Sequence, residues 1–375
     1  MPPRVKSHHR EGAAPHKRSP AASLLAWYDL HRRELPWRAK PDEISDPYFV
    51  WMSEIMLQQT TVAAVGPYFR AFTQRWPNLQ AFATASQDEI LGAWSGLGYY
   101  SRARNMHRAA KTIVAEHGGK FPGSSDALRA LPGIGPYTAA AIAAIAFGEP
   151  VAAMDANAER VIARFFAVEE ALPKARPHLA ALAAPLVPEK RAGDFAQSLM
   201  DLGSQICTTK KPACGICPLA EECRAFALGI AETLPRKAAK PSRPLKRGAA
   251  FVALDSKGAV YVVRRPEKGL LGAMLQPPLG EWSEKFPSSK SAIEAAPFTG
   301  DWSRKPGMVR HVFTHFELEM EVYVAEFRRR PNGEGFWLAR DEMKAAALPT
   351  VMRKIIDHAL DEDAPLFRKV NAGRN

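Results

Sequence analysis

Four cysteines, the only ones in a chain of 375 residues, are confined to one short segment with the spacing C-x6-C-x2-C-x5-C. Four thiolates brought together in this way can bind a tetrahedral metal ion or a cubane iron–sulfur cluster. Structural zinc loops usually pair two C-x2-C hooks, whereas this segment has one hook with a single cysteine on either side. The spacing therefore favours an iron–sulfur cluster, with zinc as the alternative, at Cys207, Cys214, Cys217 and Cys223.

Two other features could bind phosphate groups. Gly133 and Gly135, in the segment L-P-G-I-G-P-Y-T, let the backbone turn tightly between two helices. The amide groups at the start of the following helix can then bind an anion, although an ordinary turn between helices would need the same glycines. Lys210 and Lys211, within the cysteine segment, could offer ammonium groups to a phosphate backbone.

Two acidic residues occupy positions suited to catalysis. Glu54 lies among apolar neighbours in V-W-M-S-E-I-M-L and shares a predicted helix face with Trp51 and Gln58. Such a carboxyl is either paired with a buried arginine or kept protonated by desolvation, in which case it can act as a general acid. Asp155, in M-D-A-N-A-E-R-V, stands where a helix N-cap is expected, a common place for aspartate.

The residues from 20 to 233 are predicted to form helices joined by short turns. Alanine is plentiful there, apolar residues recur at spacings of three and four, and β-branched runs are scarce. One helix should open at Asp46-Pro47 and another should run from about Thr138 through Ala146. Residues 234–247 contain three prolines and six basic residues, which predicts a semi-rigid charged linker.

Beyond this linker the pattern changes to that of strands. Residues 250–254 and 259–263 flank D-S-K-G and predict a hairpin. Apolar and polar residues alternate from 315 to 324, which predicts a strand with one buried face. A further strand is expected at 335–338 and a closing helix at 351–360. Residues 248–362 are therefore predicted to form a separate α+β domain, followed by a tail at 363–375.

The charge of the chain points to a polyanionic partner. Lysine and arginine total 51 against 39 acidic residues, a net charge of +12, which by itself does not distinguish a nucleic acid from a membrane surface. No run of eighteen apolar residues occurs, so we expect no membrane span. Residues 1–19 are basic and lack the apolar segment of a secretory signal, and clustered cysteines fit a reducing compartment.

Together these motifs resemble the helix–hairpin–helix DNA glycosylases related to endonuclease III. In that superfamily the cysteine spacing holds a [4Fe-4S] cluster, and L-P-G-x-G-x-x-T-A forms the hairpin. Three further segments resemble the MutY-type adenine DNA glycosylases, namely W-M-S-E-I-M-L-Q-Q-T at 51–60, G-L-G-Y-Y-S-R-A-R-N at 96–105 and L-P-W-R at 35–38. The resemblance covers about residues 21–360 and implies a multidomain protein. It would have an all-α core with an iron–sulfur loop and a C-terminal α+β domain of the pyrophosphohydrolase (Nudix) kind.

The resemblance also implies catalytic roles. Glu54 would protonate adenine to make it a leaving group, and Asp155 would stabilise the oxocarbenium-like sugar. Bifunctional members have a lysine at the position of Tyr137, which attacks the sugar and forms a Schiff base. A phenol cannot form an imine, so we expect a monofunctional glycosylase. Ala156 replaces the glycine that family members usually carry, and Arg38 is expected to hold a catalytic-site carboxylate.

DNA contacts follow from the same resemblance. Gln59 and Tyr99 correspond to residues that wedge beside the mismatch. The segment F-T-H at 313–315 corresponds to a loop that touches 8-oxoguanine, with threonine in place of serine. The C-terminal domain lacks the R-E-x-x-E-E box of true pyrophosphohydrolases, so we expect it to bind without hydrolysing. The expected DNA-binding residues are Gln58, Gln59, Tyr99, Gly133, Gly135, Lys210, Lys211, Thr314 and His315.

The resulting hypothesis is an enzyme that removes adenine mispaired with 8-oxoguanine or guanine and leaves an abasic site. Adenine would be flipped from a bent duplex into a pocket between two helical subdomains. We expect a monomer that acts on double-stranded DNA, located in the cytoplasm at the nucleoid if the source is bacterial. One alternative is a thymine-mismatch glycosylase or an endonuclease III-like lyase, against which Glu54 and Tyr137 argue. The other is a non-catalytic iron–sulfur DNA-binding protein, against which Glu54 and Asp155 argue.

Overall fold

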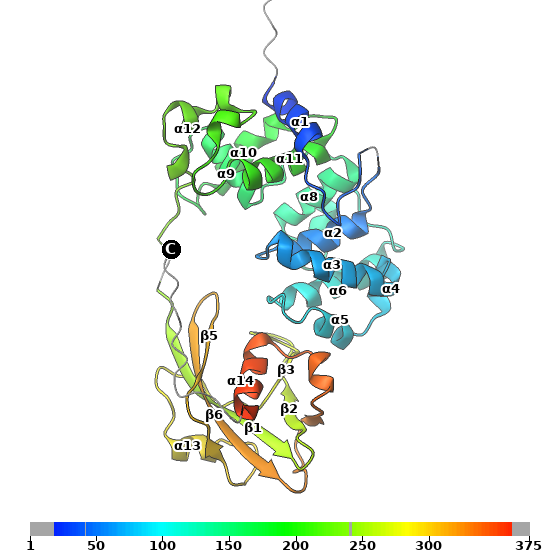
Figure 1. Ribbon diagram of the computed structural model, residues 1–375. Helices are drawn as coiled ribbons and strands as arrows, with labels where there is room; N and C mark the ends of the chain where they lie inside the picture. The colour runs from blue at the N-terminus through cyan, green and yellow to red at the C-terminus, as the bar shows by residue number, and fades with distance from the viewer. Residues whose placement is uncertain (1–18, 42, 240–241, 362–375) are drawn as a thin grey trace, which may run out of the picture. The chain divides into compact units, whose positions relative to one another are not determined.

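The computed structural model describes residues 19–41, 43–239 and 242–361 (Figure 1). Contacts divide the chain into two compact units, the first made of residues 1–47, 123–129 and 135–238, the second of residues 48–122, 130–134 and 239–375. The tails expected at 1–19 and 363–375 lie outside the described residues, apart from Ser19, which caps the first helix. The predicted domain boundaries stay a prediction.

The first unit is helical, and its core lies between α9 and its neighbours. Apolar residues of α9 recur three and four positions apart, and Val161, Ile162 and Phe165 pack with Leu199 and Leu202 of α11. The helices are α1 (Pro20–His31), α7 (Ser125–Arg129), α8 (Pro136–Phe147), α9 (Ala156–Phe165), α10 (Arg176–Ala183), α11 (Ala192–Gln205) and α12 (Arg224–Ala227). Short 3-10 helices lie at Ala184–Leu186, Cys214–Ile216, Ala220–Glu222 and Ala231–Thr233.

Helix α8 confirms the helix predicted over 138–146 and is buried from Thr138 to Ala144. Its small side chains allow α11 to approach closely, because a Cβ atom added at Gly193 would lie 2.7 Å from the carbonyl oxygen of Ala144. The close packing of α8 and α11 therefore depends on glycine at residue 193.

The helices of the second unit surround an aromatic core. Pro47 opens the first of them, as predicted, and the rings of Phe82 and Phe121 meet Trp51 edge to face. Helix α2 is apolar on nearly every side and is buried from Val50 to Met56. These helices are α2 (Pro47–Leu57), α3 (Val62–Arg75), α4 (Leu79–Thr84), α5 (Gln87–Ala93) and α6 (Ser101–Glu116).

The second unit also contains a mixed sheet in which the neighbouring strands run in the order β3-β2-β1-β6-β4. Strands β1 and β6 pair in parallel from Leu245 opposite Glu317 to Asp255 opposite Phe327, and the other strand pairs are antiparallel. Additional pairs join β5 to β6 and β7 to β2. The strands are β1 (Leu245–Asp255), β2 (Val260–Arg264), β3 (Leu275–Gln276), β4 (Ser303–Arg304), β5 (Val309–Val312), β6 (Glu317–Phe327) and β7 (Phe336–Leu338).

Helix α14 (Thr350–Leu360) covers one face of this sheet, with Val351, Met352 and Ile355 packed against Leu318 and Met320 of β6 (Figure 1). Helix α13 (Ser289–Glu294) contributes to the opposite face, and a 3-10 turn lies at Glu342–Lys344. The hairpin, the strand at 335–338 and the closing helix confirm the predicted elements.

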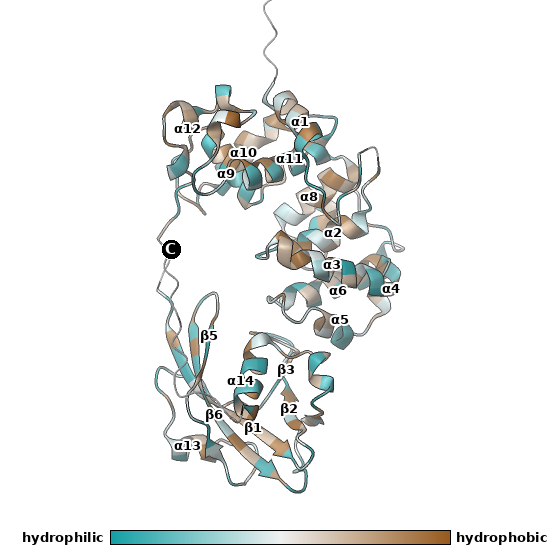
Figure 2. Ribbon diagram, viewed as in Figure 1, coloured by the Kyte–Doolittle hydropathy of each residue, from teal (hydrophilic) through white to brown (hydrophobic). Residues whose placement is uncertain are grey.

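Strand β6 departs from the prediction of one buried face. Alternation of apolar and polar residues is clear along it in Figure 2, and Leu318, Met320 and Val322 are buried as expected. Tyr323 and Ala325, on the other face, are buried as well, because they pack with Phe251 and Trp302 in a second apolar cluster. The alternating pattern does not reveal this second layer, which comes from segments distant in sequence.

The segment expected to be a linker has regular structure at both ends. Arg236 and Ala238 pair with the backbone of Leu172, and β1 begins at Leu245. Regular structure thus overlaps both ends of the expected linker, and its bounds at 234–247 stay a prediction. None of the helices formed by the described residues has the length and apolar character of a bilayer span.

Candidate active site and cysteine loop

Asp155 is the N-cap residue of helix α9, and both of its carboxylate oxygens accept hydrogen bonds from neutral donors. Its Oδ1 accepts a hydrogen bond from the backbone N–H of Ala158 at 2.7 Å, and its Oδ2 accepts one from the side-chain amide of Asn157 at 2.8 Å. Burial raises the pKa of Asp155 above its ordinary value, although these two hydrogen bonds act in the opposite direction. Ala156 begins the helix without a positive φ, so this position does not require glycine.

A chain of hydrogen bonds leads from Asp155 to the cysteine loop. Asn157 accepts a hydrogen bond from Nη2 of Arg160 at 2.8 Å, and Nε of Arg160 donates to the backbone oxygen of Cys207 at 2.7 Å. Glycine is required nearby, because a Cβ atom at Gly203 would lie 2.6 Å from Cβ of Asn157. Arg160 thus links Cys207 to Asp155 through Asn157. The sequence analysis did not identify Arg160.

The four cysteines line one cavity together with Arg164. Arg164 is buried, and its Nη1 lies 3.3 Å from Sγ of Cys207 and 2.7 Å from the backbone oxygen of Thr208. Each sulfur is half-buried, and Cys207, Cys217 and Cys223 pack against the apolar core of the first unit. The loop therefore presents four sulfurs in an apolar setting with one guanidinium beside them.

The donor set fits a cluster of several metal atoms. Burial raises the pKa of the Cys217 thiol to about 12 and also raises those of Cys214 and Cys223, so these thiols carry protons at neutral pH unless a metal replaces them. Among the described residues, no three Cys, His, Asp or Glu side chains converge as ligands of a single metal ion. Four cysteine side chains that line one cavity supply the four thiolates that a cubane cluster needs at its corners.

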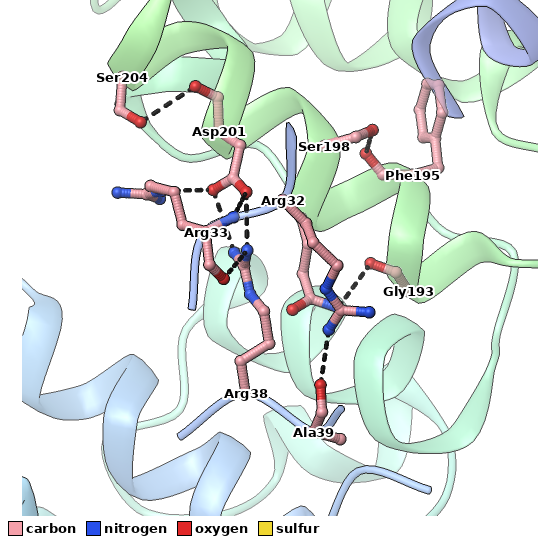
Figure 3. A network of polar contacts seen from close by, with 10 residues as sticks. Arg32, Arg33, Arg38, Ala39, Gly193, Phe195, Ser198, Asp201 and Ser204 are labelled. Carbon is pink, nitrogen blue, oxygen red and sulfur yellow. Dashed lines mark hydrogen bonds and ion pairs between the residues drawn. The ribbon is translucent and has the colours of Figure 1, made fainter. Parts of the chain in front are cut away.

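Asp201 of α11 is fully buried and binds two arginines (Figure 3). Nε of Arg33 donates to its Oδ1 at 2.6 Å, and Nη1 of Arg38 donates to its Oδ2 at 2.7 Å. Burial alone would raise the pKa of Asp201, but Arg38 and Arg33 outweigh burial and hold this pKa below its ordinary value. Arg38 therefore binds the carboxylate of Asp201. The sequence analysis did not single out Asp201, although an acidic residue in the apolar run L-M-D-L is a usable signal.

Glu54 lies in the middle of α2 and is 6% exposed. Gln58, one turn further along, is half-buried. Glu54 belongs to the second unit, whereas Asp155 and Tyr137 belong to the first. A carboxyl at this depth is desolvated by the apolar side chains of α2, which is the environment expected for a general acid.

Gln59 and Tyr99 occupy two loops of the second unit and share an unusual backbone conformation. Gln59 has φ +57° and Tyr99 has φ +46°, a region that L residues rarely adopt. Both side chains are exposed, whereas the neighbouring Tyr100 is buried. The loop before Tyr99 needs glycine, because Gly96 has φ +106° and a Cβ atom there would lie 2.3 Å from the hydroxyl of Tyr68.

The glycine hairpin has the local geometry of an exposed turn. Gly133 has φ +75°, and a Cβ atom there would lie 2.4 Å from Cβ of Asn105. Gly135 is the N-cap residue of α8 and, having no side chain, makes no side-chain hydrogen bond to the helix. Tyr137, in the first turn of α8, packs beside the alanines of α8 and α11. Lys210 and Lys211 are exposed on the cysteine loop.

The segment F-T-H lies beside the loop that carries Tyr99. Thr314 and His315 are exposed, and Oγ1 of Thr314 lies 3.1 Å from the hydroxyl of Tyr99. Nε of Arg243, a residue of the expected linker, donates to the backbone oxygen of Thr314 at 3.2 Å. A cavity of about 660 Å³ in this unit is lined by residues that include Gln59, Tyr99, Arg104, Arg243, Thr314 and His315.

Comparison with known proteins agrees with this arrangement. The chain matches the HhH-GPD superfamily base excision DNA repair protein over residues 52–185 and the NUDIX domain over residues 249–358, which confirms the predicted fold class. A thermostable thymine-DNA glycosylase of known structure is 31% identical with a TM-score of 0.51, covering 56% of this chain and 95% of that one.

Two curated relatives cover most of the chain. The human adenine DNA glycosylase is 34% identical over 89% of this chain and 72% of its own length. The adenine DNA glycosylase of Buchnera aphidicola subsp. Acyrthosiphon pisum is 31% identical over 89% of this chain and 96% of its own. With the helical core, the Nudix-type sheet and the cysteine loop all present in one chain, the protein belongs to the adenine DNA glycosylase family.

Proposed function

We propose that this enzyme removes adenine paired with 8-oxoguanine or guanine by hydrolysing the N-glycosidic bond. The observation that carries the choice of mispair is the cavity that brings Thr314 and His315 of the C-terminal domain together with Gln59 and Tyr99 of the helices. Exposed hydroxyl, imidazole and amide groups can read the edge of an oxidised base, and an exposed tyrosine can stack on the neighbouring base pair. Gln58, which precedes Gln59 in the chain, is proposed to contact the DNA from the same loop.

Glu54 donates the proton that adenine needs to leave. Neutral adenine is a poor leaving group, and a carboxyl desolvated within α2 holds its proton until the ring nitrogen of the flipped base accepts it. Asp155 then stabilises the cationic sugar, because its carboxylate faces only neutral hydrogen-bond donors and its charge is not cancelled by an ion pair. Water completes the hydrolysis, and an abasic site remains.

Tyr137 makes the enzyme monofunctional. The strand is not cut, because the phenol has no amine with which to form a Schiff base with the sugar. Tyr137 instead packs with the alanines of α8 and α11. Gly133, Gly135, Lys210 and Lys211 bind phosphates around the target nucleotide through amide and ammonium groups.

The resident cofactor in this proposal is a [4Fe-4S] cluster held by Cys207, Cys214, Cys217 and Cys223. When bound, it would take the four cysteines as thiolate ligands and fix the shape of the loop that carries Lys210 and Lys211. The purified protein should then contain iron and sulfide near four of each per chain. Zinc in place of iron after anaerobic purification would overturn this assignment.

The decisive assay uses four duplexes that each carry one mispair: A opposite 8-oxoguanine, A opposite G, C opposite 8-oxoguanine, and T opposite G. We expect products from the two adenine duplexes alone, and strand cleavage only after alkali. Release of thymine from the T:G duplex would favour the activity named for the thymine-DNA glycosylase, and cleavage without alkali would show a lyase. The enzyme is proposed to act as a monomer on double-stranded DNA, in the cytoplasm at the nucleoid if the source is bacterial.

A further inference from the structure

The two loops that carry Gln59 and Tyr99 converge on one buried side chain, that of Arg102. From the α2 side, Nη1 of Arg102 donates to the backbone oxygens of Ile55 at 2.9 Å, Met56 at 2.8 Å and Gln58 at 2.5 Å. From the other side, Nη2 donates to the backbone oxygens of Leu97 at 3.1 Å and Gly98 at 3.2 Å. One planar guanidinium thus joins the residues directly before Gln59 to those directly before Tyr99.

The acceptors on both sides are backbone carbonyls at the end of a helix or in a loop, and two of them have a second donor: Oγ1 of Thr60 for Gln58 and Nε1 of Trp94 for Gly98. Helix α2 ends at Leu57, so its last carbonyl groups have no N–H further along the helix to accept from. The carbonyls of Leu97 and Gly98 belong to an irregular loop. Arg102 satisfies both sets, and its guanidinium also lies 5.2 Å from the ring centre of Trp94 and 5.6 Å from that of Tyr99.

Arg102 occupies a position that helix electrostatics disfavours. It lies in the first turn of α6, which has no acidic residue there and no side-chain cap, and the positive end of the helix dipole repels a cation. Arg102 is also 7% exposed, and desolvation lowers its pKa to about 10, so the side chain stays charged at neutral pH at a cost in solvation. A residue with only a packing role would not need this charge.

We propose that Arg102 is a positioning residue for base extrusion, which holds the backbone of Gln59 and Tyr99 in their positive-φ conformations so that both side chains enter the duplex together. This inference rests on the wedging roles proposed above for these two residues. Positive φ is unfavourable for both, and it persists only where the surrounding structure fixes it. Lysine at residue 102 would keep the charge but could not donate to both loops in one plane.

The test compares two substrates that differ in the cost of extruding adenine. One is a duplex with adenine opposite 8-oxoguanine, and the other has adenine opposite a stable abasic-site analogue, where pairing is already lost. For Arg102→Lys at saturating enzyme we expect the single-turnover excision rate to fall by about 10- to 100-fold on the first duplex and by less than about threefold on the second. Equal losses on both duplexes, or no loss on either, would overturn the proposal.

Arg75→Lys is the matched control. Arg75 also lies over a tryptophan ring, 4.7 Å from the ring centre of Trp76, and pairs with Glu89, but it is exposed. Its replacement should leave both rates within about twofold of wild type. If Arg75→Lys reproduced the substrate-selective loss, the effect would not be specific to Arg102 and the proposal would fail.

A double-mutant cycle gives a second test of the positioning role, which a general loss of stability in Arg102→Lys would not mimic. In the background Gln59→Ala/Tyr99→Ala, whose replaced side chains are exposed, Arg102→Lys should add less than about threefold on the first duplex, because the residues that it positions are absent. Full additivity would overturn the positioning role. Failure of the wild type to release adenine from the first duplex would instead count against the proposed function.

Discussion

Two aspartates of the first unit lie on helices that pack against each other, and their surroundings shift their pKa values in opposite directions. Asp155 caps α9, its hydrogen-bond donors are neutral, and burial raises its pKa. Asp201 is fully buried in α11, binds Arg33 and Arg38, and its pKa is lowered. The charge of the partners, more than the depth of burial, therefore decides whether a carboxylate is left for chemistry or used to hold the fold.

The difference also supports the proposed role of Asp155 in stabilising a cationic sugar. An ion pair with arginine would already cancel most of its field, as it does at Asp201. Arg160 lies nearby but is bound to Asn157, Gly203 and Cys207 instead. Asn157 thus separates the guanidinium from the carboxylate, and the negative charge stays available.

The largest effect is expected at Asp155. Asp155→Asn should lower the rate of adenine excision by about 10³-fold or more, because it removes the charge beside the oxocarbenium-like sugar. Asparagine caps helices as well as aspartate, so the melting temperature should change little. Single-turnover kinetics and thermal melting of the same preparation test this. A rate within about tenfold of wild type would reduce Asp155 to a helix cap.

Asp201 should show the reverse, a large effect on stability. Asp201→Asn leaves two arginines without their counter-charge, one of them nearly buried, and should lower the free energy of unfolding by about 3–5 kcal/mol. Denaturant unfolding followed by circular dichroism measures this. Arg38→Met in the Asp201→Asn background should recover part of the loss, since the second buried charge is then gone. If Asp201→Asn lowered the free energy of unfolding by less than about 1 kcal/mol, the ion pairs of Asp201 would contribute no more than exposed salt bridges do.

The pH dependence should separate the two aspartates. The pKa of Asp155 is raised above 3.8, so its charge, and with it the excision rate, should be lost at a higher pH than for an ordinary aspartate. The pKa of Asp201 is lowered below 3.8, so its contribution to stability is present above that value and is lost as pH falls through the lowered pKa. On acidification the rate should therefore fall while the fold is intact. Single-turnover rates and circular dichroism over the same pH series check this order, and simultaneous loss would contradict it.

The smallest effect is expected at Thr314, outside the first unit. Thr314→Ala should reduce the preference for 8-oxoguanine over guanine opposite adenine by several-fold, equivalent to about 1 kcal/mol for one hydrogen bond. Thr314→Ser keeps the hydroxyl and should keep the preference. The ratio of excision rates on the two mispairs is the measurement. An unchanged ratio for Thr314→Ala would mean that the hydroxyl does not read the lesion.

Much of the fold was predictable because local patterns determine local elements. Pro47 and the apolar run after it predicted α2, and the D-S-K-G turn predicted the hairpin of β1 and β2. The second buried face of β6 was not predictable, since Phe251 and Trp302 come from other parts of the chain. The ordered pairing of Arg236 and Ala238 with Leu172 also depends on a distant segment, so composition alone suggested only a linker.

The sequence by itself determined the chemical groups of this enzyme: four cysteines in one loop, an acid within an apolar helix, an aspartate at a helix start, and tyrosine where a lyase has lysine. Spacing along the chain suffices for these, because each depends on residues within one or two turns. Only the tertiary structure decided which charge meets which partner. Asp201 finds its arginines, and Arg102 the carbonyl of Ile55 in α2, across more than forty residues of sequence, and no local pattern encodes such contacts.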